Sequence, residues 1–216
     1  MCFRLTHILF ILAIIISLSA CEKSPQQNKT DRYPWQITIL ADGSSRIFGI
    51  RLGVTTVSEA KQLIGNMPKA ALFENPDGKL SLELFYSEFS RAGLSGRLVL
   101  TIRADTTELQ GFKQQANSKN KLESGVLQYQ LDATKLNQIE SWPVASMTYM
   151  PYANLKEKII IGRFGEPAEK IRSHEQAQHW LYPDKGLDLI INEAGKEILQ
   201  YVPPTEFEML AKPLRR

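Results

Sequence analysis

The chain has 216 residues, with 26 lysines and arginines against 23 aspartates and glutamates, and a formal net charge of +3 at pH 7. This near balance gives no electrostatic preference for nucleic acid. Only two cysteines and three histidines are present, so the composition offers little material for a zinc centre.

The first twenty residues have the layout of a secretory signal peptide. Arg4 and His7 form a weakly basic start, residues 8–16 are an uninterrupted apolar run, and residues 17–20 end in small side chains. This order is typical of exported precursors. The apolar run is shorter than the roughly 20 residues that a membrane-spanning helix needs, which argues against an uncleaved transmembrane helix.

Residues 18–21, Leu-Ser-Ala-Cys, resemble the bacterial lipobox. The resemblance implies that lipid is attached to Cys21, that the chain is cut before it, and that the new amino terminus is acylated. Several acyl chains together anchor a protein stably in a membrane. Glu22 stands in place of the aspartate that enteric bacteria read as an inner-membrane retention signal, so the resemblance favours the periplasmic face of the outer membrane.

The mature chain of 196 residues would contain no free thiol. Cys2 leaves with the signal peptide and Cys21 is consumed by lipid, which excludes a disulfide, a cysteine nucleophile and a cysteine zinc ligand. Residues 21–34 are almost entirely polar up to Tyr33, and such a stretch buries too little apolar surface to offset the entropy of ordering it. We expect a flexible, lipid-anchored tether over residues 21–34.

The first folded unit is expected over residues 35–104. Residues 35–39 and 46–50 flank an Asp42-Gly43 turn, a pattern that predicts a hairpin. Thr56 and Glu59 form a capping box, which predicts a helix over residues 57–64 that stops at Gly65. Strands are predicted at residues 71–73, 80–86 and 98–102, as an antiparallel meander.

A middle segment of different character spans residues 105–150. Asp105 and Glu108 predict a capped helix that reaches residue 115, and the polar residues 117–121 predict a solvated loop. A strand at 127–131, a helical turn or two at 132–139 and a strand at 144–149 follow. These patterns leave open whether the segment is a linker or part of one continuous sheet.

The second unit is expected over residues 151–216. Asn154 with Glu157 predicts a helix start, and Gly165 followed by Pro167 predicts its end. The residues expected on the buried face of this helix are Leu155, Ile159, Ile160 and Phe164. Strands are predicted at residues 168–172, 178–182, 187–191 and 197–202, with turns at 183–186 and 193–196.

Residues 56–86 and 154–202 share one order of parts: a short helix, a glycine stop and antiparallel strands. The fold class predicted from this repetition is α+β, with two tandem units of a short helix followed by an antiparallel β-meander, joined by a mixed middle segment.

Three short motifs carry a resemblance to a known family. Gly53-Val54-Thr55 at a helix start, Phe164-Gly165-Glu166-Pro167 at a helix end and the aromatic strand Trp180-Leu181-Tyr182 resemble the SmpA/OmlA (BamE-like) family of outer-membrane lipoproteins. The resemblance implies a fold shared with the tandem β-lactamase inhibitor protein. It also implies an accessory role in outer-membrane protein assembly or envelope integrity, exerted through protein contacts.

Few residues are candidates for chemistry. His174 and His179 are separated by five positions, and an odd separation on a strand puts side chains on opposite faces, so we interpret both as surface histidines and predict no metal site. Asp184 and Asp188 have the spacing of an acid and a base, yet ordinary hairpin composition explains both. We predict no catalytic residue and no cofactor.

Aromatic residues on the predicted strands have two interpretations, a binding face or core packing, and packing is the more frequent role of large rings. The residues concerned are Trp180, Tyr182 and Tyr201 in the second unit, and Phe85 and Tyr86 in the first.

The function predicted is that of a non-catalytic envelope lipoprotein. It would be held in the membrane by lipid on Cys21, with its domain in the periplasm, and would bind an envelope protein through its sheet or the cleft between its units. The alternatives are a carrier of a small ligand or lipid, which requires an enclosed apolar pocket, and a hydrolase, which requires two carboxylates in one cleft.

Overall fold

The computed structural model describes residues 31–65, 67–132, 134–173, 177–192 and 196–215. The chain folds around one antiparallel sheet of ten strands in the order β10-β11-β12-β13-β9-β6-β5-β4-β8-β7. Together with the helices this makes an α+β protein. The strands of this sheet are β4 (Lys69–Glu74), β5 (Leu80–Arg91), β6 (Leu94–Ile102), β7 (Ser118–Lys121), β8 (Leu127–Gln130), β9 (Val144–Pro151), β10 (Glu169–Arg172), β11 (Gln178–Tyr182), β12 (Leu187–Ile191) and β13 (Glu197–Tyr201).

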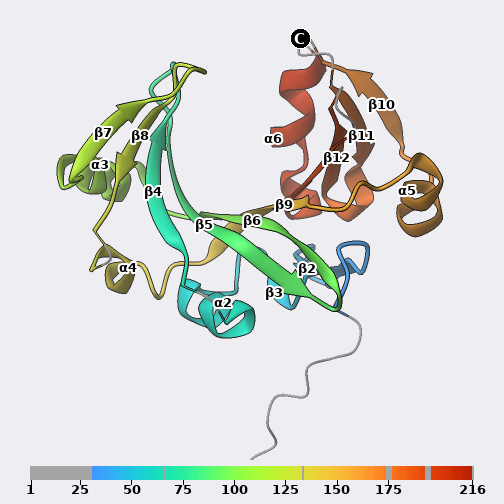
Figure 1. Ribbon diagram of the computed structural model, residues 1–216, viewed down its shortest axis with the longest axis horizontal. Coiled ribbons are helices and arrows are strands. Elements are labelled where there is room, and N and C mark those ends of the chain that lie inside the picture. The colour runs from blue at the N-terminus through green and yellow to red at the C-terminus, as the bar shows by residue number, and fades with distance from the viewer. Residues whose placement is uncertain (1–30, 66, 133, 174–176, 193–195, 216) are drawn as a thin grey trace, which may run out of the picture.

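Figure 1 shows the sheet bent into a U, with β4, β7 and β8 in one arm, β10, β11 and β12 in the other, and β6 and β9 across the base. Four of the described helices lie outside the U and α6 lies inside it, against the second arm. The α-helices are α2 (Val57–Ile64), α3 (Thr106–Gln114), α4 (Lys135–Gln138), α5 (Glu157–Phe164) and α6 (Glu208–Ala211), and 3₁₀ turns cover Pro183–Lys185, Pro204–Glu206 and Lys212–Arg215.

The main core fills the convex side of the sheet. Residues opposite one another in an antiparallel pair share a face, and the register aligns one row of side chains from β5 to β12 that is fully buried: Leu84, Leu100, Met147, Tyr201 and Leu187. The helices outside the U contribute apolar side chains to the same cluster. Burial of these side chains, at about 25 cal/mol per Å² of apolar area, fixes which face of each strand points outward.

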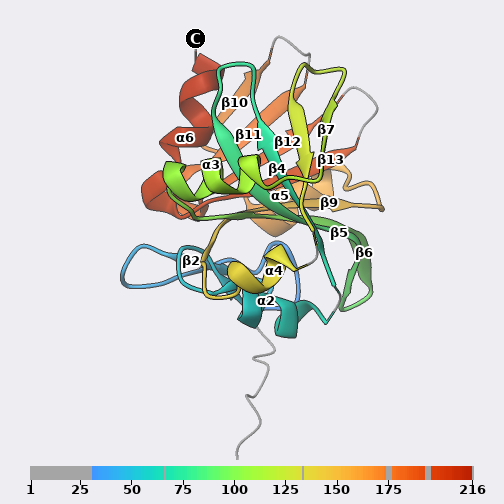
Figure 2. The ribbon, with the colours of Figure 1, turned by 90° about the vertical axis from the view of Figure 1, so that its left-hand side faces the viewer.

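The concave face carries the alternate residues. Its row across the base is Phe85, Val99, Thr148, Gln200 and Asp188. Over the second arm this face is covered by the C-terminal segment. Over the first arm, among the described residues, no helix covers it (Figure 1), and Figure 2 shows α3 on the outer side of this arm.

The C-terminal cover is a small second core. Leu181 of β11 and Val202 pack against Phe207 and Ala211 of the α6 region. Two ion pairs fasten the cover to the sheet: Arg103 with Glu206, at 2.6 Å, and Arg215 with Glu169, at 2.9 Å. The concave face of the second arm is therefore closed by the segment that directly follows β13.

Helix α2 forms as predicted. Thr56 accepts a hydrogen bond from the Glu59 amide, and the Glu59 side chain accepts from the Thr56 amide, so both halves of the capping box are present. The helix ends at Gly65, whose φ of 83° is the left-handed conformation that glycine adopts without strain. The capping box of Asp105 and Glu108 at α3 is confirmed in the same way.

The N-cap predicted for the second-unit helix is wrong. Helix α5 begins at Glu157 with Lys156 as its N-cap residue, and no side chain caps it. Ile160 and Phe164 are buried as expected, whereas Ile159 is 44% exposed. Because the helix is shorter than predicted, only a narrow row of its side chains faces the sheet, and Ile159 lies outside that row.

The middle segment contributes three strands to the sheet, β7, β8 and β9, which decides the alternative that the sequence left open. The loop predicted over residues 117–121 is wrong in part, since Ser118–Lys121 pair with β8 as the edge strand β7. All four residues of β7 are exposed. A strand that buries neither face shows no apolar alternation, so the sequence pattern could not reveal it.

The predicted N-terminal hairpin forms a small separate sheet of β1 (Thr38–Ile39), β2 (Ser45–Ile47) and β3 (Ile50–Arg51). The second predicted strand, residues 46–50, is interrupted because Phe48 and Gly49 have φ values of 52° and 82°. These two residues make a tight turn, and the chain returns as β3 beside β2.

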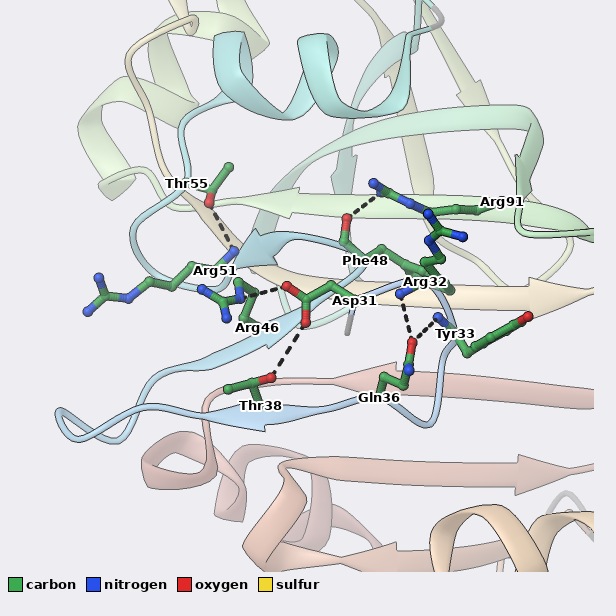
Figure 3. A network of polar contacts seen from close by, with 10 residues as sticks. All are labelled: Asp31, Arg32, Tyr33, Gln36, Thr38, Arg46, Phe48, Arg51, Thr55 and Arg91. Carbon is green, nitrogen blue, oxygen red and sulfur yellow. Dashed lines mark hydrogen bonds and ion pairs between the residues drawn. The ribbon is translucent and has the colours of Figure 1, made fainter. Parts of the chain in front are cut away.

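Polar contacts fix the start of the described chain to this small sheet (Figure 3). Asp31 is 7% exposed and forms an ion pair with Arg46 at 2.9 Å. Nearby, the Arg91 guanidinium donates to the carbonyl oxygen of Phe48. Residues 31–34, which the sequence places in the tether, thus pack onto the fold, and residues 21–30 lie outside the described residues.

Candidate binding site on the concave face

The uncovered arm of the concave face contains a half-open cavity of about 720 Å³. Strands β4, β5, β6 and β8 supply its floor, and α4 with the segments flanking β4 and β8 closes one side. The side chains that shape it are Ala71, Phe73, Glu83, Phe85, Val99 and Leu136. Cavities of about 300–1,000 Å³ are the size that holds drug-sized molecules.

Strand register brings these residues together. Phe85 lies opposite Lys69 on one side and Val99 on the other, and Glu83 lies opposite Ala71. Because the side-chain period of a strand is two, Glu83 and Phe85 lie on the face opposite to the buried leucines of β5. The alternation that builds the core therefore also builds the cavity floor.

Glu83 is the acidic residue of this floor, and Lys69 of β4 is its basic residue. The Ser81 hydroxyl donates a hydrogen bond of 3.2 Å to its carboxylate. Burial raises the pKa of Glu83 above its usual value of 4.5, and the Ser81 bond lowers it by less. Among the described residues no lysine or arginine forms an ion pair with it.

Asp132 on the cavity wall has the opposite environment. The Thr134 amide donates to its carboxylate at 3.0 Å, and this bond is the largest cause of the lowered pKa of Asp132. The cavity thus has two acidic side chains and one basic side chain, Lys69, on its wall. Its net charge favours a cation.

The predicted aromatic residues are divided by the fold. Trp180, Tyr182, Tyr201 and Tyr86 are each at most 3% exposed and belong to the core. These four rings pack the interior and form no exposed face. Phe85 alone lines the cavity.

The surface interpretation of His179 is wrong. His179 is 9% exposed, and its Nδ1 lies 2.8 Å from a carboxylate oxygen of Asp188, which is 2% exposed. Burial raises the pKa of Asp188, and the His179 bond lowers it by less. The spacing of His174 and His179 along the chain could not reveal this contact, because it joins β11 to the neighbouring strand β12. His174 lies outside the described residues, and no group of three metal-ligating side chains occurs in the described part of the chain.

Cys21, the predicted lipidation site, lies outside the described residues. Within the described ranges no helix has the length and apolar character needed to cross a membrane.

Comparison of the chain with protein-family models, with curated protein sequences and with solved structures gives no match. The site has to be interpreted from its own geometry.

Sequence reasoning missed Glu83 and the cavity around it. The signal was present, since Glu83 is the single charged residue in the alternating run Leu80–Tyr86 and shares a face with Phe85. What the run could not reveal is that the face opposite to the core is left open here and covered in the second arm.

Proposed function

We propose that the chain is a non-catalytic lipoprotein of the bacterial envelope that binds another protein on its concave face. Lipid on Cys21 would hold it at the periplasmic side of the outer membrane. The observation that carries the binding role is the uncovered, hollowed face of the first arm, since a sheet face that is left without a helix and shaped into a cavity is a common place for a partner.

The arrangement of elements supports two tandem units of the SmpA/OmlA type. Helix α2 is followed by the meander β4-β5-β6, and helix α5 is followed by the meander β10-β11-β12-β13. Strand β9 of the middle segment lies between β6 and β13 and joins the two meanders into one sheet. Each helix lies on the convex side, and the C-terminal segment covers the concave face of the second arm, so the concave face of the first arm is the one available for binding.

Site-directed photo-crosslinking in cells tests the binding role. A photoreactive residue at Gln130, which is exposed at the cavity, should give a defined crosslinked product. The same residue at Lys158, which is exposed on α5 outside the U, should give little. Equal products from both positions, or no product from Gln130, would contradict the proposal.

The anchor is tested separately by Cys21→Ser. This variant should remain uncleaved or unlipidated and should lose stable partitioning into the outer membrane, because one attachment point carries all of the acyl chains. Unchanged partitioning would refute the lipoprotein assignment without affecting the crosslinking result.

A second candidate function is a carrier of a small ligand, and the cavity volume of about 720 Å³ favours it. Mass spectrometry of the native protein purified from envelopes distinguishes the two. A carrier retains a stoichiometric small molecule, whereas a protein-binding module is recovered without one.

A further inference from the structure

The carboxylate of Glu83 lacks the partners that a half-buried charge usually has. Its cross-strand neighbours on the concave face are Ala71 and Thr101, neither of which is charged. An ionised carboxylate accepts up to about four hydrogen bonds, and the described residues supply one, from Ser81. Removing such a group from water is costly unless a cation or further donors compensate.

Glu74 shows how the same arm satisfies a carboxylate on the convex side. There, Lys113 lies 2.7 Å from one carboxylate oxygen, and the Tyr129 hydroxyl donates to the other at 2.6 Å. Hydrogen bonds from these two residues lower the pKa of Glu74, in contrast to that of Glu83. The concave carboxylate is the one left open toward the cavity.

The walls around Glu83 suit a long apolar stem. Phe85 lies two residues further along β5 on the same face, and Val99 of β6 lies beside it. Lysine and arginine bury their methylene groups along apolar surface while the charged end stays polar. Aromatic rings also attract a nearby cation through their faces.

From this geometry we infer that the cavity receives a lysine or arginine side chain of the protein partner, together with an apolar neighbour. The cationic end pairs with Glu83, and the stem lies against Phe85 and Val99. The cavity volume of about 720 Å³ accommodates a short segment of chain. The inference rests on the proposed function, because it names what the partner inserts into the concave face.

The experiment is an NMR titration of residues 21–216 carrying Cys21→Ser, expressed without residues 1–20. The probes are the peptides acetyl-Phe-Lys-Phe-amide, acetyl-Phe-norleucine-Phe-amide and acetyl-Phe-Glu-Phe-amide, which differ only in the central side chain: cationic, apolar and anionic, respectively. The lysyl peptide should bind at least about tenfold more tightly than the norleucyl peptide, because a hydrogen-bonded charge pair in a half-buried site is worth that much. Shifts should be centred on the amides of β5 and β8.

Two variants assign the preference to Glu83. In Glu83→Gln the tenfold preference should vanish, whereas the matched control Glu123→Gln, at an exposed position of the β7–β8 turn, should keep it. Glu83→Lys should bind the glutamyl peptide in preference to the lysyl peptide. Such a reversal requires a folded cavity, so it guards against a variant that merely loses structure.

Equal binding of the lysyl and norleucyl peptides, or an unchanged preference in Glu83→Gln, would overturn the inference. A third result would also overturn the inference: free 4-phenylbutylamine binds as tightly as the lysyl peptide, and Gln130 gives no crosslink. The occupant of the cavity would then be a small amine. Failure of the titration with a persistent crosslink from Gln130 leaves the proposed function standing and removes only the inference.

Discussion

Two buried tyrosines of the sheet allow one substitution to be tested in two environments. Tyr201 is fully buried, and its hydroxyl donates a hydrogen bond of 2.9 Å to the carbonyl oxygen of Pro34. Tyr86 is 2% exposed, and its hydroxyl has no hydrogen-bond partner among the described residues. Replacement by phenylalanine removes the same atom from both sites.

The expected effects have opposite signs. Tyr201→Phe leaves the buried Pro34 carbonyl without its donor, which should lower the free energy of unfolding by about 1–3 kcal/mol. Tyr86→Phe removes a buried polar group that gains nothing in the fold, so the free energy of unfolding should stay equal or rise by about 1 kcal/mol. The free energies of unfolding of the two variants should therefore differ by about 1–4 kcal/mol.

Urea unfolding of residues 21–216 carrying Cys21→Ser, followed by tryptophan fluorescence, measures both values against the same background. An unchanged slope with denaturant shows that the difference lies in stability and not in the compactness of the unfolded chain. Equal destabilisation of the two variants would refute the reasoning, because it would mean that the hydroxyl partners do not decide the outcome. A loss confined to Tyr201→Phe would also show that Pro34 is fixed to the centre of the sheet.

Three further predictions concern buried groups. Glu83→Gln should raise the free energy of unfolding at pH 7, because burial raises the pKa of Glu83 and so disfavours its ionised form in the folded state. The gain should disappear below about pH 4, where Glu83 is protonated in both the folded and the unfolded chain. His179→Ala should cost about 3–5 kcal/mol by leaving Asp188 buried without its partner, and replacing both residues by leucine should restore most of that loss in the same urea assay. Above about pH 10 the free energy of unfolding should fall, because the unfolded chain releases tyrosine protons that the folded chain retains. Tyrosinate absorbance measured at rising pH should show that the buried tyrosines ionise only when the chain unfolds. Ionisation of these tyrosines before unfolding would contradict the prediction. The tyrosines whose pKa burial raises are Tyr86, Tyr149, Tyr182 and Tyr201, with Tyr149 and Tyr182 raised to about 12.

Local signals predicted most of the elements. The capping box at Thr56 and Glu59 acts between neighbouring residues, so the sequence alone places the start of α2. The alternating run that became β5 predicted a strand because one of its faces is buried. At α5 the local signal misled, since residues 152–156 form bends and irregular backbone and the helix begins only at Glu157.

The binding site was less accessible to sequence reasoning. Glu83 and Phe85 are adjacent on one face of a single strand, and the alternation of β5 implies as much. The partners that complete the cavity come from β4, β6 and the end of β8, and only the strand register brings them beside Glu83. The His179–Asp188 contact likewise depends on the pairing of β11 with β12.

By itself the sequence determined the α+β class, the capped helix starts at Thr56 and Asp105 and most of the strands, because caps, glycine stops and apolar alternation act over a few residues. It also supplies the prediction of an exported, lipid-anchored chain through Cys21. Only the tertiary structure decided that the middle segment completes one sheet of ten strands, that the C-terminal helix covers one arm, and that the other arm keeps an acidic cavity. The strand order and the cavity depend on contacts between residues that are distant in sequence, and neither strand order nor the covering of a face leaves a local pattern to read.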